Sequence, residues 1–104
     1  MATLLYSDLA TDPDLSELVD LFVSEIPNRL GHLENVLEGR EWEEVSRAAH
    51  QMKGAAGSYG FGDVTPTAYA LELAVKENRA EDEIWSAFRD LADMCGRMRA
   101  GEPT

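Results

Sequence analysis

The sequence predicts an all-α fold, an antiparallel up-down-up-down four-helix bundle with a short helical extension at its N-terminus. Two observations predict this fold: apolar residues recur three or four positions apart in four segments, and only short breaks separate those segments. No segment alternates apolar and polar residues convincingly, as a half-buried strand does. We therefore expect a single domain over residues 1–104, with helices at about 14–38, 41–59, 66–78 and 81–98.

The first helix opens at residues 12–14, where acidic residues flank a proline suited to a first helical position. Asp14 and Glu17 offer an alternative capping box. Pro27 lies inside the apolar pattern and predicts a kink in the turn before it, and Gly39 predicts a C-terminal cap. The residues expected on the core face of this helix are Leu18, Leu21, Phe22, Ile26, Leu30, Leu33 and Leu37.

The remaining elements have their own start and stop signals. The second helix begins near Glu41 and ends at residues 60–62, which contain two glycines. Thr65 and Pro66 predict a cap and a first-position proline for the third helix. The fourth helix begins near residues 80–82. The N-terminal extension is predicted as a short helical turn that packs on the bundle through Leu4, Leu5, Tyr6 and Leu9.

Composition and charge exclude several function classes. The chain has 9 Lys+Arg against 20 Asp+Glu, a net charge of -11 that repels phosphate backbones and anionic membranes. We therefore expect neither a nucleic-acid nor a membrane partner. Residues 1–8 lack the basic and apolar regions of a secretory signal, and no apolar run is long enough to span a bilayer. Cys95 is alone, which excludes an intrachain disulfide. These features predict a cytoplasmic protein. We expect no cofactor, and a monomer is the simplest expectation.

Residues 49–60 are the most informative about function. His50 lies roughly 140° around the second helix from the centre of its apolar stripe, so we expect its side chain in solvent. Lys53, Gly54 and Gly57 lie three, four and seven residues further on, close to His50 on the helix surface. Each glycine inside a helix costs about 1 kcal/mol relative to alanine, so a compensating benefit is expected. The apolar stripe consists of Val45, Ala49, Met52, Ala56 and Tyr59.

These neighbours suit a histidine that carries a phosphoryl group. A neutral imidazole is a good nucleophile near pH 7, Lys53 would offset the charge of phosphoryl oxygens, and the glycines would let a partner approach closely. Each also has a simpler interpretation: Lys53 is an ordinary solvated lysine, or the helix ends at Lys53 and residues 54–62 form a loop. The continuing apolar spacing favours the helix. A phosphate-cradling loop is disfavoured because no strand precedes it and the Gly-Lys-Ser/Thr pattern is missing.

Residues 49–60, Ala-His-Gln-Met-Lys-Gly-Ala-Ala-Gly-Ser-Tyr-Gly, resemble the signature of histidine-containing phosphotransfer (HPt) domains. That signature has Ala-His, any residue, an aliphatic residue, Lys-Gly, two small residues, two variable ones, an apolar residue and Gly. Leu21-Phe22, Ile26-Pro27 and residues 39–42 also resemble the family's usual flanks. The resemblance extends from about residue 15 to residue 98.

The resemblance implies a phosphorelay intermediate of two-component signalling. His50 would accept a phosphoryl group on Nε2 from the aspartyl phosphate of a receiver domain and pass it to an aspartate of a second receiver. Lys53 would stabilise the phosphoryl group, and docking would use the surface around Gly54 and Gly57. The partners implied are receiver (response regulator) domains and a hybrid histidine kinase. The chain would be a carrier rather than an enzyme, because the receiver supplies the metal and most of the catalysis.

The sequence departs from the family pattern at Glu72, where a polar residue that is often Gln contacts the histidine region. Glu72 could orient the imidazole through its other nitrogen, or it could be a solvent-facing glutamate paired with Lys76 at i+4. Lys76 matches a position that is basic in some members. Phe61 replaces a commoner Ala, with an expected effect on packing alone. His32 has no motif around it and is expected at the surface or at the boundary of the core.

Two other functions are compatible with a helical bundle. The first is an adaptor that binds a receiver or another signalling partner without being phosphorylated, and the presence of both His50 and Lys53 argues against it. The second is a metal site inside the bundle, which needs several inward-facing ligands on different helices. The chain has two histidines, and one of them is predicted to point outward. Met1 and a short polar tail favour a free-standing carrier over a piece of a larger kinase.

Overall fold

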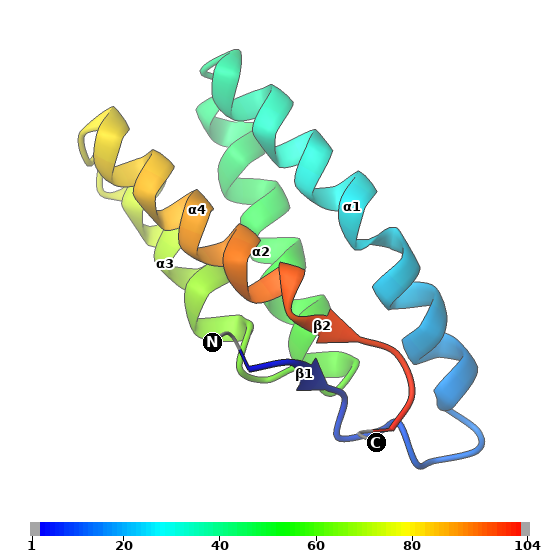
Figure 1. Cartoon of the computed structure of the whole chain (residues 1–104). Helices are drawn as coiled ribbons and strands as arrows, with labels where there is room; N and C mark the ends of the chain where they lie inside the picture. The colour runs from blue at the N-terminus through cyan, green and yellow to red at the C-terminus, as the bar shows by residue number, and fades with distance from the viewer. Residues whose placement is uncertain (1–2, 103–104) are drawn as a thin grey trace.

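The computed structural model describes residues 3–102 and contains four helices: α1 (Ser16–Glu38), α2 (Trp42–Ser58), α3 (Thr65–Lys76) and α4 (Glu81–Gly96). The chain runs up α1, down α2, up α3 and down α4 (Figure 1). Each helix packs against its two neighbours in the ring α1–α2–α3–α4. The predicted four-helix bundle is therefore confirmed, and every predicted helix boundary lies within two residues of the observed one.

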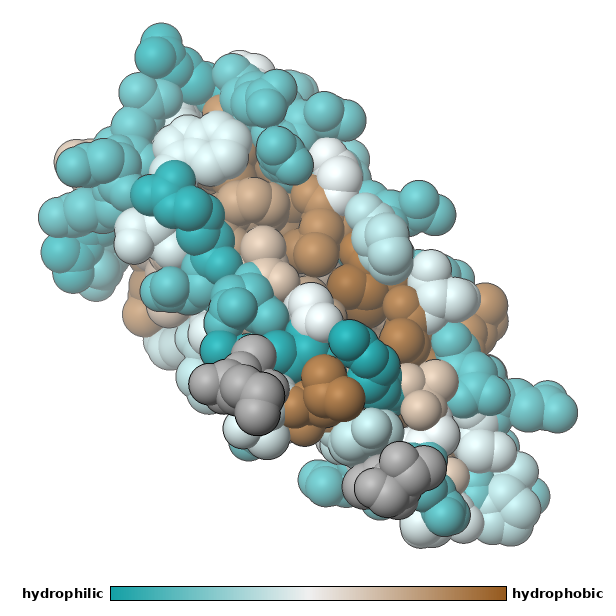
Figure 2. Space-filling model, in the orientation of Figure 1, coloured by the Kyte–Doolittle hydropathy of each residue, from teal (hydrophilic) through white to brown (hydrophobic). Residues whose placement is uncertain are grey.

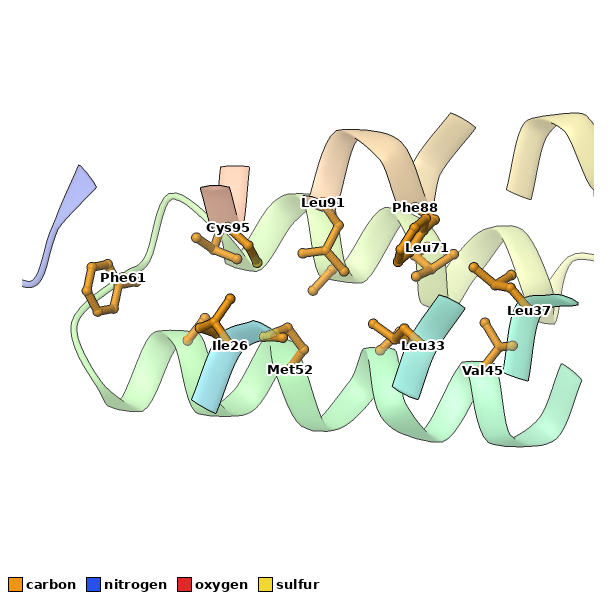
Figure 3. Close-up of a cluster of buried hydrophobic side chains, with 14 of the residues drawn as sticks. Ile26, Leu33, Leu37, Val45, Met52, Phe61, Leu71, Phe88, Leu91 and Cys95 are labelled. Carbon is orange, nitrogen blue, oxygen red and sulfur yellow. The ribbon is translucent and has the colours of Figure 1, made fainter. Parts of the chain in front are cut away.

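All four helices contribute to one apolar core along the axis of the bundle (Figure 3). Burying each large aliphatic or aromatic side chain there contributes roughly 1.5–3 kcal/mol to folding. Cys95 is one of the core residues, and burial raises the pKa of its thiol to about 12. The side chains labelled in the core are Ile26, Leu33, Leu37, Val45, Met52, Phe61, Leu71, Phe88, Leu91 and Cys95.

The predicted core face of α1 is wrong at Leu18 and Leu21, which are 46% and 56% exposed. Phe22 is buried as predicted, and Val19, which was not predicted, is buried with it. The first turns of α1 carry two adjacent rows of apolar residues. The row that faces the core is the one that continues to Ile26. Spacing within one helix cannot choose between two such rows, because the choice depends on the helices packed against them.

The N-terminal segment is not the predicted helical turn. Leu5–Tyr6 forms a short strand, β1, that pairs in parallel with β2, Met98–Arg99. Because Met98 belongs to this strand, α4 ends earlier than predicted, at Gly96. Both strands lie at the end of the bundle where α2 leads into α3 (Figure 1). A two-residue strand is too short to show alternation, and its partner lies at the other end of the chain.

The segment after β1 fastens the chain to the turn between α2 and α3. The Ser7 hydroxyl donates a hydrogen bond to the Tyr59 carbonyl, and the Asp8 N–H donates to the Gly60 carbonyl at 3.0 Å. Gly60 has a φ of +85°, and a Cβ on it would lie 2.3 Å from the Ser7 Oγ. Glycine is therefore required at this position both by the backbone conformation and by the close approach of residue 7.

The helix ends follow the predicted positions more closely than the predicted caps. The N-terminus of α1 has no side-chain cap, so the capping box of Asp14 and Glu17 does not form. Thr65 is the first residue of α3 rather than its cap, whereas Gly39 caps the end of α1 as predicted. The helix α1 is continuous through Pro27.

The molecular surface is mostly hydrophilic, with apolar side chains gathered along the seam between α1 and α4 (Figure 2). Polar side chains border this seam on both sides. No helix within residues 3–102 combines the length and the apolar composition needed to cross a membrane.

Candidate functional site

His50 lies on the outer face of α2. Its side chain is 63% exposed, whereas Ala49 and Met52 beside it are buried in the core. Gly54 and Gly57 lie within α2, which continues to Ser58, so the interpretation of residues 54–62 as a loop is wrong. The exposure expected for His50 from the apolar stripe is confirmed.

One row of α3 faces this part of α2. Its residues, Thr65, Tyr69, Glu72 and Lys76, are three or four positions apart and therefore project from the same side of the helix. At the start of the row, the Thr65 hydroxyl donates a hydrogen bond to the Lys53 carbonyl at 3.2 Å. The next three side chains of the row surround the side chains of His50 and Lys53.

Glu72 is the centre of the site. It is 2% exposed, so the interpretation as a solvent-facing glutamate is wrong, although the predicted pairing with Lys76 is present. Its Oε2 lies 2.9 Å from both Nδ1 of His50 and Nζ of Lys76, and its Oε1 lies 2.9 Å from Nζ of Lys53. Burial by itself raises the pKa of Glu72, but hydrogen bonds from Lys53, Lys76 and His50 outweigh burial and lower the pKa to about 2.

The ionised Glu72 determines which nitrogen of His50 carries the proton. A carboxylate has no hydrogen to donate, so the 2.9 Å contact requires Nδ1 of His50 to be the donor. In a neutral imidazole the other nitrogen, Nε2, then has no proton and holds a free lone pair. Nε2 has no hydrogen-bond partner among residues 3–102. The arrangement therefore presents an unprotonated ring nitrogen on an exposed side chain.

Lys53 is held between two side chains of α3. Besides its ion pair with Glu72, its ammonium lies 4.9 Å from the centroid of the Tyr69 ring, a cation–π distance. Tyr69 is 47% exposed and was not singled out by the sequence analysis. Because Tyr69 lies three residues before Glu72 on the same helix, its spacing could have indicated that both side chains face α2.

The whole bundle, including this site, matches a known family. The model of the Hpt domain matches residues 17–101, which is most of the chain. The chain belongs to the Hpt domain family. The resemblance drawn from residues 49–60 is thereby confirmed, and histidine phosphotransfer in two-component phosphorelays follows from membership, as does the role of a phosphocarrier rather than a classical enzyme. No curated protein and no solved structure matches the chain significantly.

The two glycines of this Hpt domain are not required by its own packing. A Cβ added at Gly54 would meet nothing within 4 Å, and one at Gly57 would only reach ordinary contact with the Thr65 Oγ1 at 3.5 Å. Both glycines are exposed on α2, near His50. The surface beside the histidine is thus left bare although the fold has room for larger residues.

An open groove borders the site on the other side of α2. It is lined from α1 by Glu25, Asn28 and His32 and from α2 by Ala48 and Gln51, the residue after His50. The His32 side chain is 53% exposed, which confirms the expectation of a surface position. Within residues 3–102, no group of three or more His, Cys, Asp or Glu side chains is placed to hold a metal ion.

Proposed function

We propose that this Hpt domain is a phosphorelay intermediate in which Nε2 of His50 accepts a phosphoryl group from a receiver aspartyl phosphate and passes it to the aspartate of a second receiver. The observation that carries this proposal is the contact between Nδ1 of His50 and the buried carboxylate of Glu72. That contact leaves Nε2 as the nucleophile on an exposed face.

The two transfers need no proton to be exchanged with solvent. Nε2 attacks the phosphorus, the bond from phosphorus to the donor aspartate breaks, and the aspartate leaves as a carboxylate. The phosphorylated ring is then positively charged because Nδ1 keeps its proton, and the carboxylate of Glu72 stabilises that charge. In the second transfer the acceptor carboxylate attacks the phosphorus, the N–P bond breaks, and neutral His50 is restored.

The negative charge of Glu72 does not by itself oppose the incoming phosphoryl group. Its carboxylate is bonded to the ammonium groups of Lys53 and Lys76, so the three side chains together carry a net charge of +1. This positive charge lies beside His50, within a chain whose net charge is -11. An anionic donor group is therefore attracted locally, and we assign phosphoryl stabilisation to Lys53 with Lys76 in support.

We further propose that receiver domains dock on the exposed face of α2 around Gly54 and Gly57, where no side chain blocks close approach. The metal ion and most of the catalytic groups for the transfer belong to the receiver in this proposal. Leu21, exposed on α1, continues the row of Glu25 and Asn28 that lines the groove beside α2. It offers apolar contact area next to the docking face.

The decisive test uses phosphoramidate, a small donor that needs no partner protein. Wild type, His50→Gln and His32→Gln are incubated with it and examined by mass spectrometry and phosphorus NMR. We expect an acid-labile adduct in wild type and in His32→Gln and none in His50→Gln. A folded wild-type protein without an adduct at His50 would overturn the relay proposal in favour of the adaptor.

A further inference from the structure

We propose that Tyr69 is a positioning residue for phosphotransfer, whose ring holds the ammonium of Lys53 beside His50. This inference rests on the proposed function, because it concerns the same phosphoryl acceptor. The evidence is the 4.9 Å distance between Nζ of Lys53 and the centroid of the Tyr69 ring. Tyr69 follows Thr65 and precedes Glu72 in the row of α3 that faces α2.

Lys53 needs more than one contact to stay near the phosphoryl group. A lysine side chain has many rotamers, and its flexibility must be restricted if it is to stabilise charge at a fixed place. Glu72, which is 2% exposed, draws the ammonium inward and neutralises part of its charge. Tyr69, which is 47% exposed, attracts the same ammonium towards the surface.

The ring and the carboxylate have different electrostatic effects on Lys53. The face of an aromatic ring attracts a cation through its quadrupole and carries no net charge. Tyr69 therefore restricts Lys53 without cancelling the positive charge that the phosphoryl oxygens require. Without this ring, the Lys53 ammonium would keep only its contact with the buried carboxylate of Glu72, out of the two contacts described above.

The phenol hydroxyl has no part in this role, which gives a matched pair of variants. Tyr69→Phe keeps the ring face, and Tyr69→Leu removes it while keeping an apolar residue of high helix propensity at a half-exposed position. The rate of His50 phosphorylation by phosphoramidate is expected to be unchanged in Tyr69→Phe and about threefold to tenfold lower in Tyr69→Leu. Because no partner protein is present, a loss of docking cannot produce this difference.

A double-mutant cycle separates action through Lys53 from any other effect of Tyr69. Lys53→Met removes the ammonium and keeps most of the apolar stem. If Tyr69 acts through Lys53, the double variant Lys53→Met/Tyr69→Leu reacts no more slowly than Lys53→Met alone. If Tyr69→Leu lowers the rate by the same factor in both backgrounds, the proposal is overturned.

Proton NMR of the unphosphorylated protein provides a readout that is independent of the relay. The ring current of Tyr69 should shift the side-chain methylene protons of Lys53 nearest its ammonium to higher field in wild type and in Tyr69→Phe, and this shift should vanish in Tyr69→Leu. Within residues 3–102 no aromatic ring lies over the ammonium of Lys76, so Lys76 is the internal control. An unshifted Lys53 in wild type overturns the positioning role. A wild type that shows the shift but is not phosphorylated at His50 contradicts the proposed function instead.

Discussion

The two histidines of this protein share many features, and the differences between them support the proposal that His50 is the phosphoryl acceptor. Both lie on exposed helix faces, and both contact a glutamate on a neighbouring helix: His50 contacts Glu72 at 2.9 Å and His32 contacts Glu44 at 3.2 Å. Glu72 is buried, whereas the Glu44 side chain is 30% exposed. An exposed histidine with a nearby carboxylate is thus common to both sites, and the burial of the carboxylate is the first feature that distinguishes them.

The ring nitrogen that makes the contact also differs. Nδ1 of His50 faces its glutamate, which leaves the outer nitrogen Nε2 for chemistry, whereas His32 uses Nε2 itself. The basic side chains that form ion pairs with the two glutamates differ as well. Glu72 is held by the ammonium groups of Lys53 and Lys76, and Glu44 is held by the exposed Arg47. His50 therefore differs from His32 in having a buried glutamate partner, bonded to two lysines, on Nδ1 rather than on Nε2.

The largest expected difference between the two histidine sites is the effect on the phosphorylation rate when the charge of the neighbouring glutamate is removed. In Glu72→Gln the side chain can still accept a hydrogen bond from His50, but it no longer carries the charge that balances a phosphorylated ring. We expect phosphorylation by phosphoramidate to be about tenfold slower in Glu72→Gln and unchanged in Glu44→Gln. Equal rates in the two variants would show that the negative charge of the buried Glu72 has no role in the reaction.

A smaller effect is expected at glycines on the two helices that carry the histidines. Gly54 on α2 and Gly31 on α1 both have room for a Cβ, so alanine at either position should raise the melting temperature by about 4 °C through helix propensity. Phosphorylation by phosphoramidate should not change in either variant.

The two alanine variants should differ when the phosphoryl donor is a receiver domain. We expect transfer from a phosphorylated receiver to be roughly threefold slower or more in Gly54→Ala, because the added methyl group stands on the docking face. Gly31→Ala should match wild type. Equal transfer rates in both variants would remove the docking role assigned to Gly54.

The smallest effect concerns stability in acid. The folded protein lowers the pKa of Glu72 from 4.5 to about 2, so its ionised form adds stability that is fully present above pH 4.5 and is lost as the pH falls towards 2. Because both lysine partners are partly exposed, we expect a contribution of roughly 1 kcal/mol. Denaturant unfolding of wild type and Glu72→Gln should show a difference in stability that shrinks between pH 5 and pH 2. A constant difference would contradict the lowered pKa.

The sequence was sufficient to predict the bundle, the helix boundaries and the exposure of His50, because each depends on the spacing of apolar residues within one segment. It was not sufficient to predict the burial of Glu72, which depends on how α3 is rotated against α2. The same limit explains Tyr69, whose role appears only when its ring is placed against Lys53. The exposed Leu18 and Leu21 were misassigned because two apolar rows in α1 fit the same spacing.

The pairing of β1 with β2 has a consequence for the kinetics of folding. It joins Leu5 to Met98, whereas most helix contacts join segments that follow one another along the chain. Closing so long a loop is entropically unfavourable until the intervening helices have assembled, so we expect this pairing to form late in folding. Interactions that form after the transition state slow unfolding without speeding folding. We therefore expect the short N-terminal strand, which precedes the matched family region of residues 17–101, to slow unfolding and to leave the folding rate unchanged.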